Sequence, residues 1–292
     1  MIKTDITGIG DPFILLHNDI YYLYATSASD GFKYWTSEDL ESWTEGGYCY
    51  RNSPWAEGDF WAPEAYAKNG KFYLIYTARW KKNHSLRIGV AVADSPKGPF
   101  VDVKDGPLFD YGYAAIDATL ISEGGKDYLF YVRDCSENVI DGVHTSVIYA
   151  SEITKDCTAL VGEPVKIIGP DREYEFKSGN EWRWNEGPVL LKRNGRFYLN
   201  YSMNFYASRD YSIGCAESDF ILGPYEKYAA PVLVYREGDF SGPGHNSLFY
   251  GKDGRLYTTF HVHTNYDEPS GDRRACIAEA YFDEQGKMQI RL

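Results

Sequence analysis

The chain has 292 residues and a mass of 33.2 kDa, enough for two ordinary domains or one large all-β domain. Its 30 basic and 42 acidic side chains give a formal net charge of −12. An acidic chain repels phosphate backbones, so this charge argues against a nucleic acid partner. No apolar run approaches the roughly 20 residues of a membrane helix, which argues against a membrane partner.

The cysteines are odd in number and widely spaced, with no CxxC pair: Cys49, Cys135, Cys157, Cys215 and Cys276. This pattern argues against a disulfide framework or a zinc site and favours free thiols in a reducing compartment. The N-terminal segment also lacks the apolar core of a secretory signal. The sequence therefore predicts a cytoplasmic protein, or a secreted one if a leader has been removed.

One pattern recurs five times along the chain. A polar residue opens a short apolar run, a turn follows, and an aromatic strand comes next; the copies span 11–26, 63–78, 117–133, 186–203 and 245–262. Asn-Gly, Gly-Gly and Asp-Gly pairs supply hairpin turns in four of the copies. The matching tyrosines lie 52, 55, 70 and 59 residues apart, at Tyr21, Tyr73, Tyr128, Tyr198 and Tyr257.

A further strand and turn follow each copy, at 33–43, 88–100, 146–154, 213–225 and 275–287. Each unit thus holds three or four short antiparallel strands, and no stretch has helical periodicity with caps. Five units of this size predict an all-β fold, a five-bladed β-propeller, formed by a single catalytic domain over residues 1–292. The alternative is a β-sandwich whose repeats resemble one another by accident.

The polar residues that open the five copies are Asp11, Glu64, Asp117, Glu186 and His245. Equivalent positions of a radially symmetric fold lie around the same axis, so we expect these side chains to converge at one end of the channel. Like charges repel and burial of a charge is costly, so carboxylates do not gather for stability. Their convergence indicates a functional site.

Hydrolysis of a glycosidic bond requires two carboxyl groups. One protonates the leaving oxygen, and the other activates water or attacks the sugar carbon. A third carboxylate nearby can raise the pKa of the acid by repulsion and keep it protonated near neutral pH. Asp11, Asp117 and Glu186 can fill these three roles.

Several short motifs together resemble glycoside hydrolase family 43 over nearly the whole chain. They are Gly10-Asp11-Pro12, Trp61-Ala62-Pro63-Glu64, Ile116-Asp117-Ala118, Asn185-Glu186-Gly187-Pro188, Gly242-Pro243-Gly244-His245-Asn246 and Arg273-Arg274-Ala275-Cys276-Ile277. The resemblance implies an inverting hydrolase of arabinofuranosyl or xylosyl linkages in arabinan or xylan. It implies that Asp11 is the general base, that Glu186 is the general acid, and that Asp117 tunes the pKa of the acid and orients it.

The resemblance also places His245 near the propeller axis, beside a bound calcium or other ion. A histidine that is only hydrogen-bonded in the channel is the equal alternative. Calcium prefers oxygen ligands, so water molecules would have to complete its coordination shell.

Five further residues are predicted to bind substrate. Trp61 and Trp184 have the flat apolar faces on which sugar rings stack, although blade packing is an equal alternative. Arg79 follows an inner strand, and the family match suggests that Arg274 lies near the site, with a surface cation as its alternative. Glu64 is interpreted as a binding or structural group at the axis.

Three alternative functions remain at this stage. A fructan hydrolase would carry its nucleophile in a longer segment than the Gly-Asp-Pro-Phe found at 10–13, and a glycoside phosphorylase would need a basic phosphate pocket. A non-catalytic carbohydrate-binding propeller would need aromatic residues but not three convergent acids. We further expect the insert from Cys157 to Trp184 to wall off part of the pocket and favour terminal sugars.

Overall fold

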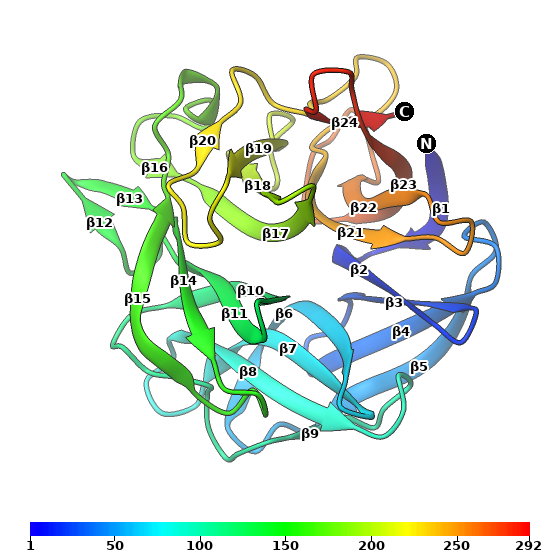
Figure 1. The fold of residues 1–292 in the computed structure, drawn as a ribbon, viewed down its shortest axis with the longest axis vertical. Coiled ribbons are helices and arrows are strands. Elements are labelled where there is room, and N and C mark those ends of the chain that lie inside the picture. The colour runs from blue at the N-terminus through cyan, green and yellow to red at the C-terminus, as the bar shows by residue number, and fades with distance from the viewer.

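The computed structural model describes all residues from 1 to 292, and its strands form five antiparallel sheets around one axis (Figure 1). Blade 1 holds β2 (Gly10–His17), β3 (Ile20–Thr26), β4 (Gly31–Ser37) and β5 (Thr44–Arg51). Blade 2 holds β6 (Ala56–Lys68), β7 (Lys71–Trp80), β8 (Leu86–Ala93) and β9 (Val101–Asp102). Blade 3 holds β10 (Ala115–Glu123), β11 (Lys126–Arg133), β14 (Val147–Ile153) and β15 (Leu160–Ile168).

Blade 4 holds β17 (Asn185–Arg193), β18 (Arg196–Met203), β19 (Ser212–Ser218) and β20 (Glu226–Lys227). Blade 5 holds β21 (Gly244–Tyr250), β22 (Leu256–His263) and β23 (Arg273–Phe282), with β1 (Ile2–Thr7) and β24 (Met288–Arg291) both paired to β23. A small sheet joins β12 (Val139–Ile140), β13 (Val143–Thr145) and β16 (Trp182–Arg183). The predicted five-bladed propeller is confirmed, and the sandwich alternative is wrong.

The first and last segments of the chain complete the same blade. In the register of β1 on β23, Ile2 lies opposite Ile277 and Lys3 opposite Cys276. β24 pairs with the other end of β23, so the two termini lie side by side in Figure 1. This pairing closes the ring by strand hydrogen bonds.

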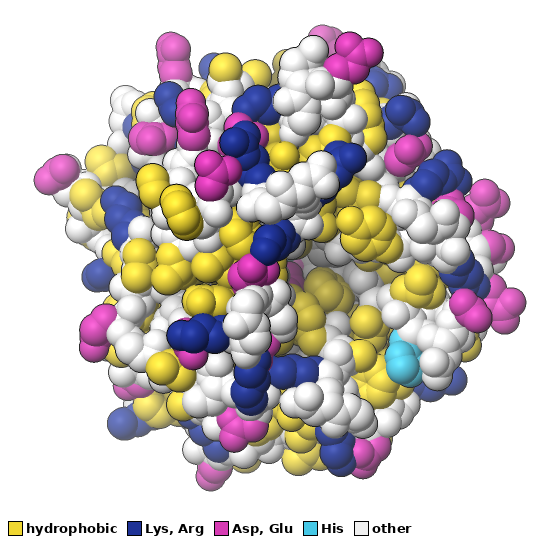
Figure 2. All heavy atoms as spheres, in the orientation of Figure 1, with side chains coloured by type: hydrophobic (Ala, Val, Ile, Leu, Met, Phe, Trp, Pro, Cys, Tyr) yellow, Lys and Arg dark blue, Asp and Glu magenta, His cyan; other side chains and the backbone are white.

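The hydrophobic core lies between neighbouring blades and uses the high aromatic content. Phe32 and Tyr50 of blade 1 pack against Phe60 and Tyr76 of blade 2. The ring centroids of three of these pairs lie 5.6–6.0 Å apart across the blade boundary, and those of Tyr50 and Tyr76 lie 4.9 Å apart. Burying each such side chain contributes about 1.5–3 kcal/mol. In Figure 2 charged side chains are spread around the rim of this face, and both hydrophobic and charged ones lie around the hollow at its middle. The only helix is the short 3₁₀ turn Glu173–Glu175, and no helix is long and apolar enough to cross a membrane.

Each innermost strand carries a β-bulge where it reaches the axis. In blade 1, for example, Gly10 lies opposite Thr26 but Phe13 lies opposite Tyr24, so the inner strand has one extra residue. A bulge bends its strand and redirects side chains. The bulged residues have φ values from 46° to 54° and are Asp11, Ala62, Asp117, Gly187 and His245.

These bulges correct the expected equivalence of the five opening residues. Asp11, Asp117 and His245 are equivalent, but Glu186 precedes the bulged Gly187, and Glu64 lies two residues after the bulged Ala62. Spacing to the tyrosines could not locate the bulges, because a bulge is set by the strand register. This difference matters for function because Glu64, two residues after the bulged Ala62, lies deeper in the channel than the bulged residues.

A ring of hydrogen bonds joins the blades through these bulges. The backbone N–H of each bulged residue donates to a side chain of the preceding blade. The five acceptors are His261 Nδ1 at 3.1 Å, Thr26 Oγ1 at 2.9 Å, Thr77 Oγ1 at 3.0 Å, Asp117 Oδ2 at 3.0 Å and Ser202 Oγ at 2.7 Å. A positive φ costs on the order of 1–3 kcal/mol at a non-glycine residue, and these hydrogen bonds help to offset it.

Candidate active site

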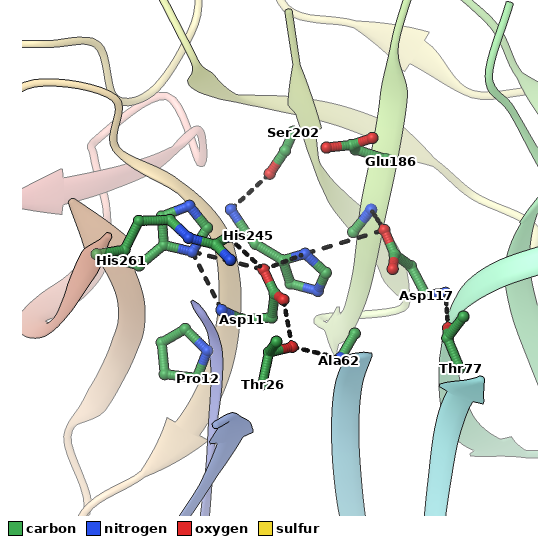
Figure 3. A network of polar contacts seen from close by, with 12 residues as sticks. Asp11, Pro12, Thr26, Ala62, Thr77, Asp117, Glu186, Ser202, His245 and His261 are labelled. Carbon is green, nitrogen blue, oxygen red and sulfur yellow. Dashed lines mark hydrogen bonds and ion pairs between the residues drawn. The ribbon is translucent and has the colours of Figure 1, made fainter. Parts of the chain in front are cut away.

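A cavity of about 460 Å³ lies where the bulged ends of the inner strands meet. This volume is in the range of pockets that hold small ligands. The cavity is lined by seven residues that the sequence predicts for the site: Asp11, Trp61, Arg79, Asp117, Trp184, Glu186 and His245. Figure 3 shows the three acids around this end of the axis, with His245 between Asp11 and Asp117.

Asp11 is held as a carboxylate by its neighbours. Burial pushes its pKa upward, but Arg273, His245 and His261 outweigh burial and hold the pKa well below its usual range. Arg273 Nη1 lies 3.1 Å from Asp11 Oδ1, and the Thr26 hydroxyl donates to Asp11 Oδ2 at 2.6 Å. Asp11 is therefore ionised across the neutral pH range, which is the state that a general base requires before it accepts a proton.

Glu186 has the opposite character. Burial raises its pKa to about 8, so the side chain is protonated near neutral pH. The Tyr211 hydroxyl, which donates to Glu186 Oε1 at 2.7 Å, opposes this rise. Because Oε1 accepts that bond, the proton of the neutral acid belongs on Oε2, where it is available to a substrate.

Asp134 and Asp11 supply the negative charges that raise the pKa of Glu186 further. Burial raises the pKa of Asp117 itself to about 8, so Asp117 is mostly protonated near neutral pH and imposes little charge on the acid. Asp117 Oδ2 instead accepts the Gly187 N–H, next to Glu186 in the chain. It replaces the hydroxyl that blades 1, 2 and 4 supply for this hydrogen bond, because blade 3 has Val132 at the corresponding register.

His245 offers a poor cage for calcium. Its Nδ1 faces carboxylate oxygens, 3.2 Å from Asp11 Oδ1 and 3.9 Å from Asp117 Oδ2. No group of three or more His, Cys, Asp or Glu side chains in the chain is arranged to hold a metal ion. An ion beside His245 would depend mainly on water ligands, so the residues do not fit a resident metal, and no chemical step is assigned to one.

Glu64, one of the predicted binding residues, does not line the cavity. It lies below the bulge layer, where it is 7% exposed and accepts a hydrogen bond from the Tyr66 hydroxyl. Burial without a cationic partner raises its pKa to about 8. The bulge places Glu64 in the deeper layer, which favours the structural interpretation of this residue over substrate contact.

Arg274 is also absent from the cavity, and its neighbour Arg273 lies there instead. Successive side chains of a strand point to opposite faces, so only one of two adjacent arginines can face the axis. Arg273 contacts Asp11, whereas Arg274 pairs in register with Thr7 of β1 and Val262 of β22. The motif at 273–277 does bring an arginine to the site, but the side chain that faces the cavity is that of Arg273 and not that of Arg274.

Several residues of the site were missed. Tyr211 and Asp134 have no motif around them, and Phe205 and Tyr206 follow β18 in a loop of irregular sequence. His261 alternates with His263 along β22, and both side chains are buried. Its Nδ1 accepts the Asp11 N–H, and its ring stacks on that of Tyr211 with centroids 5.5 Å apart. Tyr211 and His261 thereby connect Glu186 to Asp11.

Two carboxyl groups with opposed pKa shifts that line one cavity match the acid and the base that glycoside hydrolysis requires. Comparisons with known proteins agree. Residues 7–288 match the profile of Glycosyl hydrolases family 43. The chain belongs to this family and is an O-glycosyl hydrolase, so the fructan hydrolase alternative is wrong.

Solved structures and characterised relatives are similar over almost the whole chain. A thermostable family-43 glycoside hydrolase superposes with a TM-score of 0.96 at 43% identity, covering 100% of this chain and 96% of that one. A protein named endo-1,4-beta-xylanase from Bacteroides thetaiotaomicron gives 0.87 at 32% identity, with 100% and 97% covered. The beta-D-galactofuranosidase xynD of Aspergillus niger is 27% identical, over 95% of this chain and 81% of that protein.

Proposed function

We propose that the chain hydrolyses terminal arabinofuranosyl or xylosyl linkages of plant polysaccharide fragments by a single displacement with inversion. The observation that carries this proposal is the pairing of an ionised Asp11 with a protonated Glu186 across one cavity. A general base and a general acid are the two groups that an inverting glycosidase requires.

In the proposed mechanism, Asp11 Oδ accepts a proton from the water that attacks the anomeric carbon. Glu186 Oε2 gives its proton to the leaving oxygen as the glycosidic bond breaks. Arg273 keeps Asp11 ionised, and Tyr211 keeps the Glu186 proton on the outer oxygen. Asp117 is proposed to orient the acid through Gly187 and to tune its pKa only when it is itself ionised.

The names of relatives support a pentose substrate without selecting one. The Streptomyces chartreusis relative, 27% identical over 90% of this chain, is named an extracellular exo-alpha-(1->5)-L-arabinofuranosidase. A Xylanibacter ruminicola relative, 26% identical over 81% of this chain, is named a beta-xylosidase. Of the insert from Cys157 to Trp184, only Trp184 lines the cavity, and the proposed preference for terminal sugars rests on this residue.

The cytoplasmic location and the absence of a nucleic acid partner remain proposals. All five cysteines are buried and unpaired, which supports a reducing compartment. Cell fractionation with an antibody against the chain tests the location directly.

Hydrolysis of aryl α-L-arabinofuranosides, aryl β-D-xylosides, arabinan and xylan tests the proposed activity, and proton NMR of the first-formed sugar tests its stereochemistry. We expect a single inverted anomer. A retained anomer would show that an aspartate acts as a nucleophile and would refute the assignment of Asp11 as base. No cleavage across the whole panel would refute the pentosidase proposal.

A further inference from the structure

A line of aromatic rings leads out of the active-site cavity onto the small β12–β13–β16 sheet. Trp184 lines the cavity, and its ring is parallel to that of Trp182, with an interplanar angle of 14° and centroids 6.1 Å apart. The Trp182 ring in turn stacks on the His144 ring at 4.0 Å, also at 14°. All three side chains are partly exposed.

Strand geometry decides how these rings are arranged. His144 and Trp182 are register partners on β13 and β16, so the line between them runs across the strands. Trp182 and Trp184 are two residues apart in an extended segment, so the line between them runs along the chain. Because the second displacement runs along the chain, we infer that the two nearly parallel indoles are offset from one another and form one roughly flat surface, called here the indole plane.

The open face of Trp182 is the one turned away from His144, while at the cavity end the Phe205 ring packs against Trp184 with centroids 5.6 Å apart. β16 pairs only with β13, so no strand covers its other edge. Arg183, between the two tryptophans, lines a separate cavity on the opposite face of the small sheet, together with Val143 and Thr145. This alternation confirms that Trp182 and Trp184 point to the same side.

His144 fixes the outer end of the plane. Its Nδ1 lies 2.8 Å from the Cys135 carbonyl oxygen, and its backbone N–H donates to the Glu181 carbonyl at 2.9 Å. The loop that carries Cys135 also brings Ser136 and Glu137 to the cavity, where both are exposed. Flat apolar faces beside hydroxyl and carboxylate groups match the mixed surface of a sugar chain.

The position of the indoles relative to Glu186 tells which part of a substrate they meet. Trp184 and Trp182 precede Glu186 by two and four residues, which is roughly 7 and 13 Å of extended chain. Glu186 is the proposed donor to the leaving oxygen, whereas Asp11 is held by Arg273 and His261 from blade 5. The indoles thus precede the acid on the same segment of chain, and from this we infer that they serve the leaving-group side.

We propose that Trp182 and Trp184, supported by His144, bind the leaving-group portion of a neutral pentose oligosaccharide over more than one sugar unit. This inference rests on the proposed function and adds a substrate class to it: oligosaccharides or side-chain-bearing polymers, in preference to disaccharides. The cavity holds the terminal sugar, and the indole plane holds the chain that departs.

The test measures kcat/KM against substrate length for the wild type and for Trp182→Ala. In the wild type, kcat/KM rises from the two-unit to the four-unit substrate. In Trp182→Ala that rise is reduced about tenfold, equivalent to about 1.4 kcal/mol. Hydrolysis of an aryl pentoside, whose leaving group is a single ring, falls by much less than hydrolysis of the four-unit substrate.

Trp182→Tyr keeps a flat ring and should recover part of the length dependence. Phe220→Ala is the matched control, because Phe220 is 69% exposed and lies outside the cavity and the indole plane. Equal losses on all substrates in Trp182→Ala, or an unchanged length dependence, would overturn the proposal.

A binding measurement separates this inference from the proposed function. In a Glu186→Gln background turnover is blocked, and tryptophan fluorescence reports binding of the four-unit oligosaccharide directly. Trp182→Ala should weaken that binding about tenfold and leave the two-unit sugar unaffected. Absence of oligosaccharide binding in Glu186→Gln would refute the platform, whereas binding without hydrolysis by the wild type would refute only the activity.

Discussion

Tyr211→Phe isolates the hydrogen bond that controls the proposed acid. The variant keeps the ring that stacks on His261 and removes only the hydroxyl, which lies 2.7 Å from Glu186 Oε1. That bond favours the carboxylate over the neutral acid, because an ionised acceptor gains more from it. The removal should therefore raise the pKa of Glu186 above its value of about 8.

The size of the effect follows from the two states of the acceptor. A hydrogen bond to a charged group contributes about 1.5–3 kcal/mol and one between neutral groups about 0.5–1.5 kcal/mol. The difference of about 1.4 kcal/mol corresponds to roughly one pH unit. The basic limb of the kcat/KM profile should move upward by that amount, while turnover of natural substrates falls because the proton is no longer confined to Oε2.

The assay is a pH–rate profile from about pH 5 to pH 10 with an aryl pentoside and with an oligosaccharide. Tyr131→Phe is the matched control, since Tyr131 is equally buried and its hydroxyl contacts Tyr113 outside the cavity. A basic limb that stays in place, or that moves to lower pH, would refute the assignment of Glu186 as the acid held by Tyr211.

Four further predictions test the site and its surroundings. Asp11→Asn should slow turnover for every leaving group, whereas Glu186→Gln should spare aryl glycosides with acidic phenols. Equal losses of turnover for aryl and natural substrates in Glu186→Gln would remove Glu186 from the acid role. Asp134→Asn should lower the pKa of Glu186 and move the basic limb of the pH–rate profile to lower pH, and Asp117→Asn should move it by less. A larger shift in Asp117→Asn than in Asp134→Asn would show that Asp117 is the main modulator of the acid. Glu64 has a folded-state pKa raised to about 8, so its contribution to the free energy of unfolding is complete below about pH 4.5. Between about pH 4.5 and 8 that contribution is lost by about 1.4 kcal/mol per pH unit. Denaturant unfolding of Glu64→Gln should show a slope against pH that is flatter by that amount, and an unchanged slope would mean that Glu64 is ionised in the fold. Chelator treatment should change neither activity nor melting temperature, and a loss reversed by calcium would contradict the poor fit of the axial histidine to a metal.

The repeat pattern determined the architecture because a propeller is built from local hairpins. Each copy contains its own turn and its own aromatic strand, so the five units were visible without any long-range information. Asp11, Asp117 and Glu186 were found for the same reason, since each lies at the start of a copy. The closure of blade 5 by β1 was not visible, because it joins segments that are more than 250 residues apart.

Side-chain direction was decided only in three dimensions. A one-residue bulge moved Glu64 out of the cavity, and strand alternation exchanged Arg274 for Arg273. Tyr211 reaches Glu186 across 25 residues through a loop that has no periodicity to read. The sequence by itself determined which blades carry acids, because that depends on local spacing. Only the tertiary structure decided which acid is ionised and which is protonated, because pKa values depend on burial and on charges brought from other blades.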